Sequence, residues 1–307
     1  MATSAVNAPS HEPFQAAQAW AFPRSQSPDP SLPRQAPTPK PDPNEPLHVP
    51  GSTRTYTRAQ LATGFDAADW FPQDHPPMPH VVAYGRKPAW ACAACHKPGG
   101  EGFPASAELA GLPKAYLRRQ LRAFRDGERY NDIMPTEVRR LDQADERSAI
   151  AYFSKLKPAS HVRVIETASV PKTHWNDYVL VPDRSGAREP IGERIIEVAP
   201  EDGERGDERV TYIAYVPPGS IAAGERIATQ GVGTAPACAA CHGASLQGTG
   251  EVPYLAGRSP TYIARELILF REGKRTNTGA APMRAEVAHL TLQDMIDVAA
   301  YAAARKP

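Results

Sequence analysis

The sequence predicts a mainly α-helical protein with two tandem homologous domains, a proline-rich arm before them and a short-strand insert between them. Three observations lead to this prediction. The stretch that begins at Leu109-Ala110-Gly111 recurs from Leu255-Ala256-Gly257, the pattern Cys-Ala-Ala-Cys-His occurs once in each copy, and β-branched residues gather in 159–217, outside the repeat. A repeat of this length indicates two copies of one structural unit.

The repeat divides the 307 residues into four segments. They are an extended arm at 1–60, a first domain at 61–158, an insert at 159–217 and a second domain at 218–307. A chain of this length is long enough for two domains with residues left over for arms and linkers.

The arm has nine prolines between Pro28 and Pro50 and little apolar periodicity. Such a segment buries too little apolar surface to fold alone. We expect either a solvated tail or an arm that wraps its own domains or a partner. Aromatic residues from Tyr56 to Phe71 mark the beginning of ordered structure.

Each copy of the repeat is expected to be helical. Pro113 opens and Gly127 closes an amphipathic segment, and the segment from Pro260 to Gly273 repeats it. A final helix starts after Asp142 in the first copy and with a capping-box-like Thr291 in the second.

A further short helix is expected before the second Cys-Ala-Ala-Cys-His pattern. Ser220 is predicted to cap it, and Gly224 within it has no side chain, so that another helix can cross closely there.

The insert contains runs of β-branched and aromatic residues separated by Pro, Gly and charged turns. They predict three or four short strands in a small antiparallel sheet or an extended clamp. The runs are Val162–Ile165, Tyr178–Val181, Ile195–Val198 and Val210–Val216. A spacer that fixes the geometry between the domains is favoured over a docking surface or a lid.

The two Cys-X-X-Cys-His motifs, Cys92–His96 and Cys238–His242, use all four cysteines of the chain. Two cysteines one helical turn apart can form thioethers to the vinyl groups of a haem, and the following histidine is then the proximal ligand of the iron. Cys-X-X-Cys alone also occurs in redox dithiols and zinc sites. The adjacent histidine in both copies favours two covalently attached c-type haems, with the cysteines Cys92, Cys95, Cys238 and Cys241 as attachment points and the histidines His96 and His242 as iron ligands.

The sixth ligand of each iron separates an electron carrier from an enzyme with an open site. Of the five methionines, only Met134 and Met283 are related by the repeat, and each is expected in a loop between the two helices of its copy, beside a proline. Methionine ligation raises the reduction potential and leaves no position for a substrate. We expect Met134 and Met283 to be the axial ligands, with no catalytic residue.

Other candidates are weaker. His75, Met78 and His80 are near the first motif and are minor alternatives as ligands of the first haem. Met295 is expected in the core of the last helix, and His174 and His289 are expected to be solvated.

A basic helix, with Arg118, Arg119, Arg122 and Arg125, is either a solvated face or a docking patch for an acidic partner. The repeat preserves Arg125 as Arg271. These two arginines are candidates to pair with haem propionates, since arginine matches the geometry of a carboxylate.

Composition excludes several classes of function. The net charge of +1 gives no sign of nucleic-acid binding, and no apolar run approaches the length of a transmembrane helix. The first residues have no basic region followed by an apolar core, so we expect a mature chain without its export signal. A periplasmic location is inferred from the haem motifs alone.

With these motifs, the chain resembles the class I cytochromes c, specifically the tandem dihaem cytochrome c4 group. The resemblance lies in Cys92–His96 with Met134, in Cys238–His242 with Met283, and in the shared Leu-Ala-Gly element and Ala-Tyr of the last helix. It implies two class I cytochrome c domains that transfer single electrons between periplasmic or membrane redox partners. A dehydrogenase is the implied donor, and an oxidase or another cytochrome the acceptor.

Two alternatives to a free carrier stay open. The chain is either a cytochrome subunit of a dehydrogenase or oxidase complex, associated with a membrane complex through the arm and the insert, or a dihaem enzyme of the thiosulfate dehydrogenase or peroxidase type. The enzyme is the weaker alternative, because both copies keep the methionine and no cysteine remains for thiolate ligation.

Overall fold

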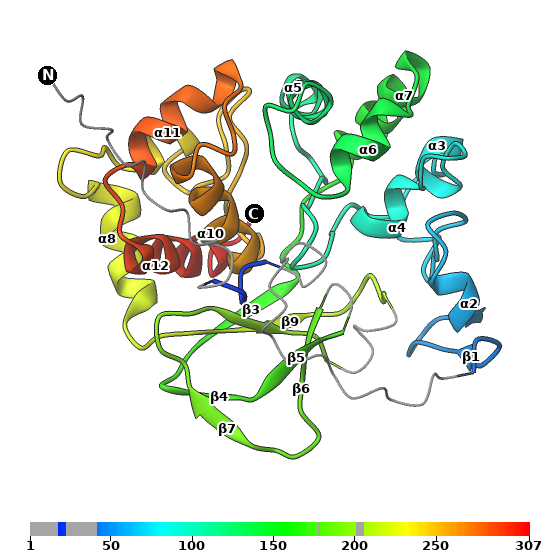
Figure 1. Ribbon diagram of the computed structural model, residues 1–307, viewed down its shortest axis with the longest axis horizontal. Coiled ribbons are helices and arrows are strands. Elements are labelled where there is room, and N and C mark those ends of the chain that lie inside the picture. The colour runs from blue at the N-terminus through cyan, green and yellow to red at the C-terminus, as the bar shows by residue number, and fades with distance from the viewer. Residues whose placement is uncertain (1–17, 23–41, 177–178, 201–205) are drawn as a thin grey trace, which may run out of the picture.

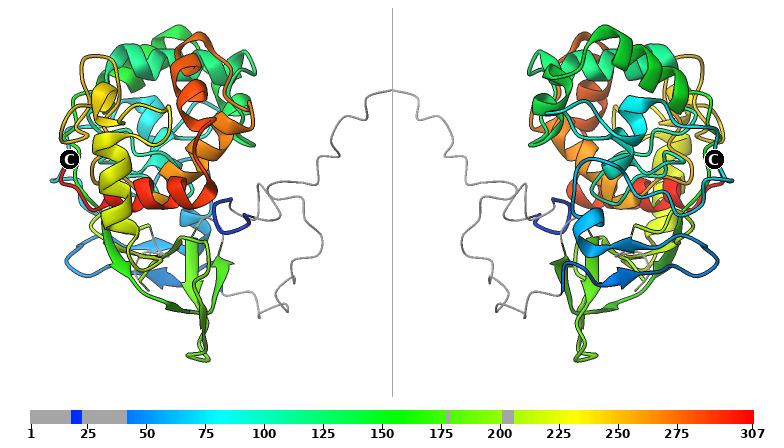
Figure 2. Two further views of the ribbon diagram at one scale, coloured as in Figure 1. Left: turned by 90° about the vertical axis from the view of Figure 1, so that its left-hand side faces the viewer. Right: turned by 90° about the vertical axis from the view of Figure 1, so that its right-hand side faces the viewer.

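A computed structural model describes residues 18–22, 42–176, 179–200 and 206–307. Most helices lie at one end of the molecule and most strands at the other (Figure 1), and the perpendicular views show the same division (Figure 2). The predicted mainly α-helical class with a strand-rich insert is confirmed. In the described part of the chain, no helix has the length and apolarity needed to cross a membrane.

The first copy of the repeat folds around a core that includes Leu112, Leu117, Ile150 and Phe153. Its helices are α3 (His80–Ala83), α4 (Cys92–His96), α5 (Lys114–Arg125), α6 (Met134–Arg139) and α7 (Gln143–Phe153). As predicted, α5 follows Pro113 and ends before Gly127, which has a φ of 76° that favours glycine. Asp142 caps α7, its carboxylate accepting hydrogen bonds from the Ala144 and Asp145 amides at 2.8 and 2.9 Å.

The second copy follows the same order with longer outer helices. It comprises α8 (Ser220–Gln230), α9 (Ala239–His242), α10 (Pro260–Arg271), η3 (Thr278–Ala280), α11 (Ala281–Val287) and α12 (Leu292–Ala303). The predicted capping box of α12 is present, with Thr291 and Asp294 bonded to each other's backbone amides.

Gly224 allows α8 and α12 to cross closely, as the sequence predicted. A Cβ atom at this position would lie 1.9 Å from the Asp297 backbone oxygen and 2.8 Å from the Tyr301 Cβ. The predicted cap of α8 was wrong by one residue. Gly219, with a φ of 86°, is the N-cap, and Ser220 is the first helical residue.

The two long central helices of the repeat differ in their surroundings. In α5 the side chains of Lys114, Arg118 and Arg122 are exposed, whereas α10 is buried on nearly all sides. The insert covers α10, since the Glu197 carboxylate of strand β8 (Ile196–Val198) accepts hydrogen bonds from the Ser259 hydroxyl at 2.6 Å and the Thr261 amide at 3.2 Å. The two equivalent helices therefore differ: one face of α5 is exposed to solvent, whereas the insert covers α10.

The insert has more strands than the three or four that we predicted, and its sheet is mixed rather than antiparallel. Its strands are β3 (Val162–Glu166), β4 (Ser169–Pro171), β5 (Thr173–Asn176), β6 (Val179–Pro182), β7 (Arg188–Pro190), β8 and β9 (Tyr212–Val216). Five of them pair in the order β3-β9-β8-β6-β5, in which β3 with β9 and β6 with β8 are parallel, and β4 and β7 form a separate antiparallel pair. The direction of pairing depends on long-range connections that β-branched runs do not encode.

Buried contacts join the insert to the first copy of the repeat. The Lys97 ammonium, next to the first haem motif, donates a hydrogen bond to the Asp207 carbonyl at 2.9 Å. It also lies 4.7 Å from the centre of the Phe103 ring and 5.3 Å from that of Tyr212. The insert is therefore packed against the first domain as well as the second.

The described parts of the arm pack on the chain itself, whereas 1–17 and 23–41 lie outside the described residues. Trp20, Ala21 and Phe22 are buried in the core that contains α10 and α12. The Arg265 guanidinium of α10 donates to the Ala21 carbonyl at 3.0 Å. Further along, β1 (Pro46–Leu47), β2 (Tyr56–Thr57) and α2 (Arg58–Leu61) accompany a small core with Trp70 and Phe71.

Candidate haem sites

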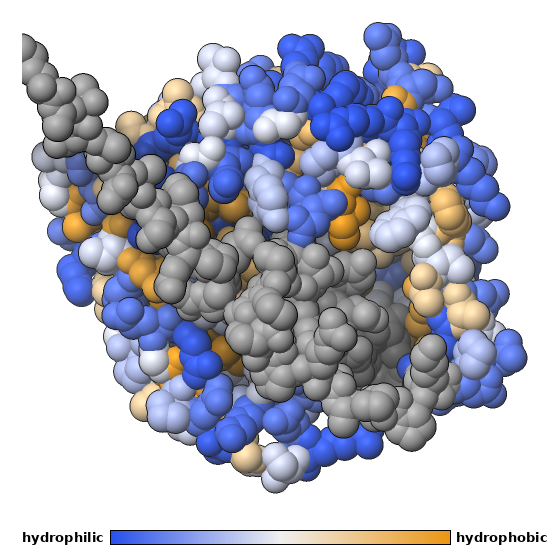
Figure 3. Space-filling model, in the orientation of Figure 1, coloured by the Kyte–Doolittle hydropathy of each residue, from blue (hydrophilic) through white to orange (hydrophobic). Residues whose placement is uncertain are grey.

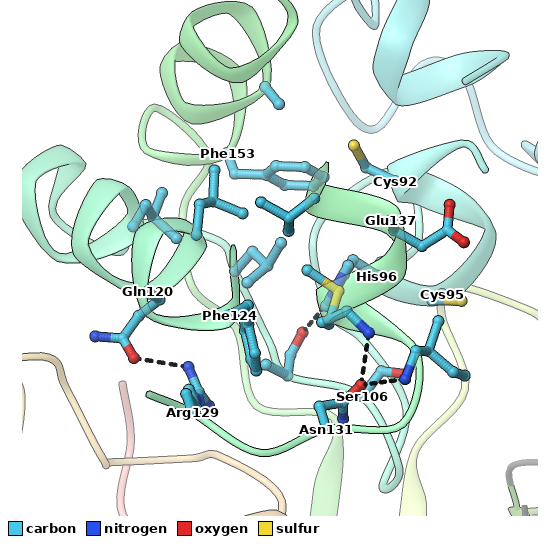
Figure 4. Close-up of a pocket in the computed structure, with 18 of the residues that line it drawn as sticks. Cys92, Cys95, His96, Ser106, Gln120, Phe124, Arg129, Asn131, Glu137 and Phe153 are labelled. Carbon is cyan, nitrogen blue, oxygen red and sulfur yellow. Dashed lines mark hydrogen bonds between the residues drawn. The ribbon is translucent and has the colours of Figure 1, made fainter. Parts of the chain in front are cut away.

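The structure brings the four residues predicted for the first haem to one pocket. Cys92, Cys95 and His96 of α4 and Met134 of α6 all line it. Figure 4 shows the two cysteines on one side of this pocket and Gln120 and Phe124 of α5 on the other. Residues of α4, α5 and α6, which are distant in sequence, therefore lie around the same pocket.

A second pocket repeats the arrangement. Cys238, Cys241 and His242, which belong to α9 and its N-cap, line it together with Met283 of α11. The repeat-related positions therefore occupy equivalent places, and both predicted axial pairs are brought into shared pockets.

Each motif histidine is oriented by a backbone carbonyl. Nδ1 of His96 lies 2.8 Å from the Ala107 oxygen, and Nδ1 of His242 lies 2.8 Å from the Pro253 oxygen. A carbonyl can only accept, so Nδ1 carries the proton and Nε2 keeps its lone pair for a metal. Burial lowers the pKa of both imidazoles and favours this neutral form.

The cysteine environment suits a thioether rather than a thiolate. Burial raises the pKa of the Cys92 thiol to about 12 and the pKa of the Cys95 and Cys238 thiols to about 11. Zinc and reactive dithiol sites need thiolates in polar or electropositive surroundings. Within the residues that the structure describes, no three His, Cys, Asp or Glu side chains converge as a metal-binding group.

Met134 is the first residue of α6 rather than part of a loop, and a neighbouring side chain holds this start of the helix. The Asn131 Oδ1 atom accepts hydrogen bonds from the Ile133 amide at 2.9 Å and the Met134 amide at 2.8 Å. This contact sets the start of α6 and directs the segment along the edge of the pocket. The segment before Met283 is different. The short helix η3 leads directly into α11, and Met283 lies within α11.

The pockets have the chemical character that a haem needs. Apolar side chains form most of each lining, among them Leu117, Phe124 and Phe153 in the first and Ile227 and Phe270 in the second. A haem also carries two propionates that require cationic partners. The Nε atoms of Arg129 and Arg275 are buried without a hydrogen-bond partner among the described residues, and each of these arginines lines one pocket. The residues present therefore fit the group.

The structure does not bring Arg125 and Arg271 to the pockets, so the prediction that they pair with propionates is not supported. The Arg125 guanidinium forms an ion pair with Glu146 and donates to the Val138 carbonyl. The Arg271 guanidinium donates to the Leu290 carbonyl at 3.4 Å. Both side chains tie the central helix of their domain to a following segment.

The minor ligand candidates are also placed elsewhere. His75 lies 3.1 Å from Asp69 through Nε2, and Met78 packs against the core of the first domain. Neither they nor His80 line the first pocket. Met295 is fully buried in α12, as predicted.

The two expected surface histidines have local partners. His174 lies 2.7 Å from Asp183, and His289 lies beside the Thr234 hydroxyl.

The basic helix is partly neutralised. Arg119 forms an ion pair with Glu251, whereas Lys114, Arg118 and Arg122 point to solvent. The space-filling view shows hydrophilic side chains over this upper part of the molecule (Figure 3). This outcome agrees with a solvated face.

Four residues that line both pockets form a shared wall, which sequence reasoning missed. They are Tyr116 and Gln120 of α5, and Tyr262 and Glu266 of α10. Arg129 and Arg275 adjoin this wall. All six are related in pairs by the repeat, and the signal that could have identified them is a polar or charged residue retained at equivalent positions next to an apolar helix face.

Comparisons with known proteins agree with this geometry. A family model described as Cytochrome c matches residues 221–304. The chain is 31% identical over 220 residues to the thiosulfate dehydrogenase electron acceptor of Thiomonas intermedia, which covers 71% of this chain and 79% of that protein. It is 26% identical to cytochrome c4 of Pseudomonas aeruginosa, over 72% of this chain and 86% of that protein.

Among solved structures, the chain is similar to the thiosulfate dehydrogenase TsdBA from Marichromatium purpuratum. The TM-score is 0.53 at 29% sequence identity. The match covers 73% of this chain and 39% of that chain, so the relative contains much that this chain does not match.

Proposed function

Because this chain belongs to the cytochrome c4-like family of dihaem c-type cytochromes, we propose that each of its two pockets holds one covalent haem. The first is attached to Cys92 and Cys95, and the second to Cys238 and Cys241. His96 with Met134, and His242 with Met283, are the axial ligand pairs. The observation that carries the proposal is the convergence of each motif with its repeat-related methionine in one pocket.

The protein is a dihaem electron carrier. Each bound haem supplies a one-electron iron couple. The chain determines how that couple behaves. His96 and His242 present Nε2 because a carbonyl holds Nδ1, and the side chains around each pocket are mostly apolar. With haem bound, the soft thioether of Met134 or Met283 would raise the reduction potential and leave no position for a substrate.

Closure at both sites favours a carrier over an enzyme. A dihaem oxidoreductase needs at least one haem with a displaceable ligand and space for substrate beside it. Both pockets contain a methionine, and neither is lined by a cysteine beyond the motif pair. We therefore propose that the chain has no catalytic residue.

The partner is proposed to be a periplasmic dehydrogenase. Relatives from Thiomonas intermedia and Stutzerimonas stutzeri, each 31% identical, are named as electron acceptors of thiosulfate dehydrogenase. An acceptor of this kind takes single electrons from the dehydrogenase and delivers them to a cytochrome or an oxidase.

Single methionine variants of the full holoprotein test the ligand assignment. Met134→Ala and Met283→Ala should each open one haem, so that the ferric protein binds one equivalent of cyanide or imidazole with a change in its absorption spectrum. Met78→Ala is a matched control, because Met78 packs beside the first domain but does not line the pocket. The control should behave as the wild-type protein does.

Two outcomes of these measurements would contradict the proposal. If neither Met134→Ala nor Met283→Ala binds cyanide more readily than the wild-type protein, the axial assignment is wrong. If the wild-type protein already binds cyanide at one haem, that haem has an open position, and the hypothesis of a dihaem enzyme is then favoured.

A further inference from the structure

Four side chains between the two pockets form a closed hydrogen-bonded ring, which we call the interpocket cluster: Gln120, Arg129, Glu266 and Arg275. Gln120 Oε1 accepts from Arg129 at 2.8 Å and from Arg275 at 2.9 Å. Glu266 Oε2 accepts from the same two guanidinium groups, at 3.0 and 2.6 Å. Each arginine therefore binds both acceptors.

The cluster has local two-fold symmetry that follows from the repeat. Residue 120 corresponds to residue 266, and residue 129 to residue 275, at the same offset in sequence. The backbone is paired across the same axis. The Tyr130 amide donates to the Lys274 carbonyl at 2.8 Å, and the Thr276 amide donates to the Glu128 carbonyl at 2.7 Å. This antiparallel pairing fixes both arginines where the two domains meet.

One position breaks the symmetry in charge but not in hydrogen bonding. Gln120 and Glu266 make equivalent contacts, yet only Glu266 bears a negative charge. Burial alone would raise the pKa of Glu266, but the charges of Arg129 and Arg275 outweigh burial and hold it below its usual value. The carboxylate is therefore ionised, and the cluster contains two cations and one anion.

The location of this charge gives it access to both redox centres. Glu266 lines both pockets, and each of its two arginine partners lines one of them. The Nε atoms of both arginines are buried without a hydrogen-bond partner among the described residues. Its side chain is only 13% exposed, so water screens it weakly. A buried anion stabilises the ferric state of a haem relative to the ferrous state, because ferric iron has one more positive charge.

Resting on the proposed function, we propose that Glu266 sets the reduction potentials of the two haems and makes them unequal. The carboxylate lowers both potentials. It is displaced from the local two-fold axis, since Gln120 occupies the symmetric place, and so it affects one haem more than the other. A neutral residue at both positions would leave this wall of the two pockets electrostatically equivalent.

Three variants of the full holoprotein test the proposal. Glu266→Gln removes the charge and keeps the shape, Gln120→Glu adds a second charge, and the double variant moves the single charge to the symmetric position. The midpoint potential of each haem is measured by a redox titration followed through the shifted haem methyl resonances in NMR spectra. The axial-methionine variants assign each potential to its haem.

The expected results are specific. Glu266→Gln should raise both potentials, and Gln120→Glu should lower both. The double variant should restore the mean potential towards that of the wild-type protein and reverse the sign of this charge's contribution to the separation between the haems. Urea unfolding of each variant shows whether the domain interface persists.

A purely structural role predicts a different pattern. Unchanged potentials in a Glu266→Gln variant that retains two His/Met haems would overturn the inference, whether or not its stability falls. A wild-type protein without two such haems would instead overturn the proposed function, so the two failures are distinguishable.

Discussion

Replacing Gly224 with alanine should loosen the crossing of α8 and α12 and thereby disturb the second haem pocket selectively. The new Cβ would lie 1.9 Å from the Asp297 oxygen and 2.5 Å from its carbonyl carbon. These are backbone atoms, which cannot rotate aside. The helices must separate, and residues from both, Ile227 of α8 and Val298 of α12, line the second pocket.

The magnitude follows from two opposed effects. Overpacking a core costs about 1–3 kcal/mol, and a clash with backbone belongs at the upper end. Glycine to alanine within a helix gains about 1 kcal/mol of helix propensity. The expected net loss is therefore about 2 kcal/mol of unfolding free energy, which corresponds to a fall in melting temperature of roughly 8–16 °C for a domain of this size class.

Urea unfolding of the ferric holoprotein, followed by far-UV circular dichroism, measures this loss, and the shifted haem methyl resonances in NMR spectra report on each haem separately. Ala222→Gly on the exposed face of α8 is the control and should lose about 1 kcal/mol through helix propensity alone. The reasoning about close crossing would be refuted if Gly224→Ala were as stable as the wild-type protein, or if the first haem responded and the second did not.

Three further predictions concern the insert, the arm and the pocket arginines. Burial, with a smaller contribution from Glu101, raises the pKa of Glu208 to about 7, so the folded protein holds an extra proton between pH 4.5 and 7 and loses stability as pH rises through this range. Glu208→Gln, which can still accept from the Trp70 amide, should be more stable than the wild-type protein by up to about 3 kcal/mol at pH 8 and by nothing at pH 4 in urea titrations, and an equal difference at both pH values would contradict this. Trp20→Ala should cost about 3–5 kcal/mol in the same assay, because Trp20 is 6% exposed in the core around α10, and a loss below 1 kcal/mol would show that residues 18–22 do not anchor there. Arg275→Gln should lower the potential of the second haem more than that of the first, and Arg129→Gln should do the reverse; equal shifts at both haems in redox titrations would argue against separate propionate contacts.

The helices were predictable because their signals are local. Pro113, Gly127, Asp142 and Thr291 mark boundaries through backbone geometry and capping, which depend only on nearby residues. The repeat then transferred each boundary from one copy to the other. One exception, the cap of α8, arose because Gly219 can adopt the left-handed conformation that a serine disfavours.

Pairings between distant segments were not predictable in the same way. The β-branched runs of the insert identified strands, but the parallel pairing of β3 with β9 depends on where the insert leaves one domain and enters the other. The contact of residues 18–22 with Arg265 likewise joins segments far apart in sequence. Trp20 and Phe22 were the available signal, in a segment otherwise dominated by proline and polar residues.

The residues of the candidate site show the same difference between what the sequence predicts and what it does not. The cysteines, histidines and methionines were identified from the motif and the repeat, and the structure places them together. The pairing with haem propionates was assigned to Arg125 and Arg271, which do not line the pockets. The repeat also preserves Arg129 and Arg275, and the sequence does not show which of the two pairs lies at the pockets. Arg129 and Arg275 follow the central helix and turn inward where the two copies pair.

Ferric-state spectroscopy of the full holoprotein tests most directly whether the chain is a closed-site electron carrier. Electron paramagnetic resonance, combined with haem quantification, should show two low-spin haems per chain, each with histidine and methionine ligands, and neither should bind cyanide readily. A high-spin haem, a haem with two histidine ligands, or fewer than two covalent haems per chain would contradict this conclusion.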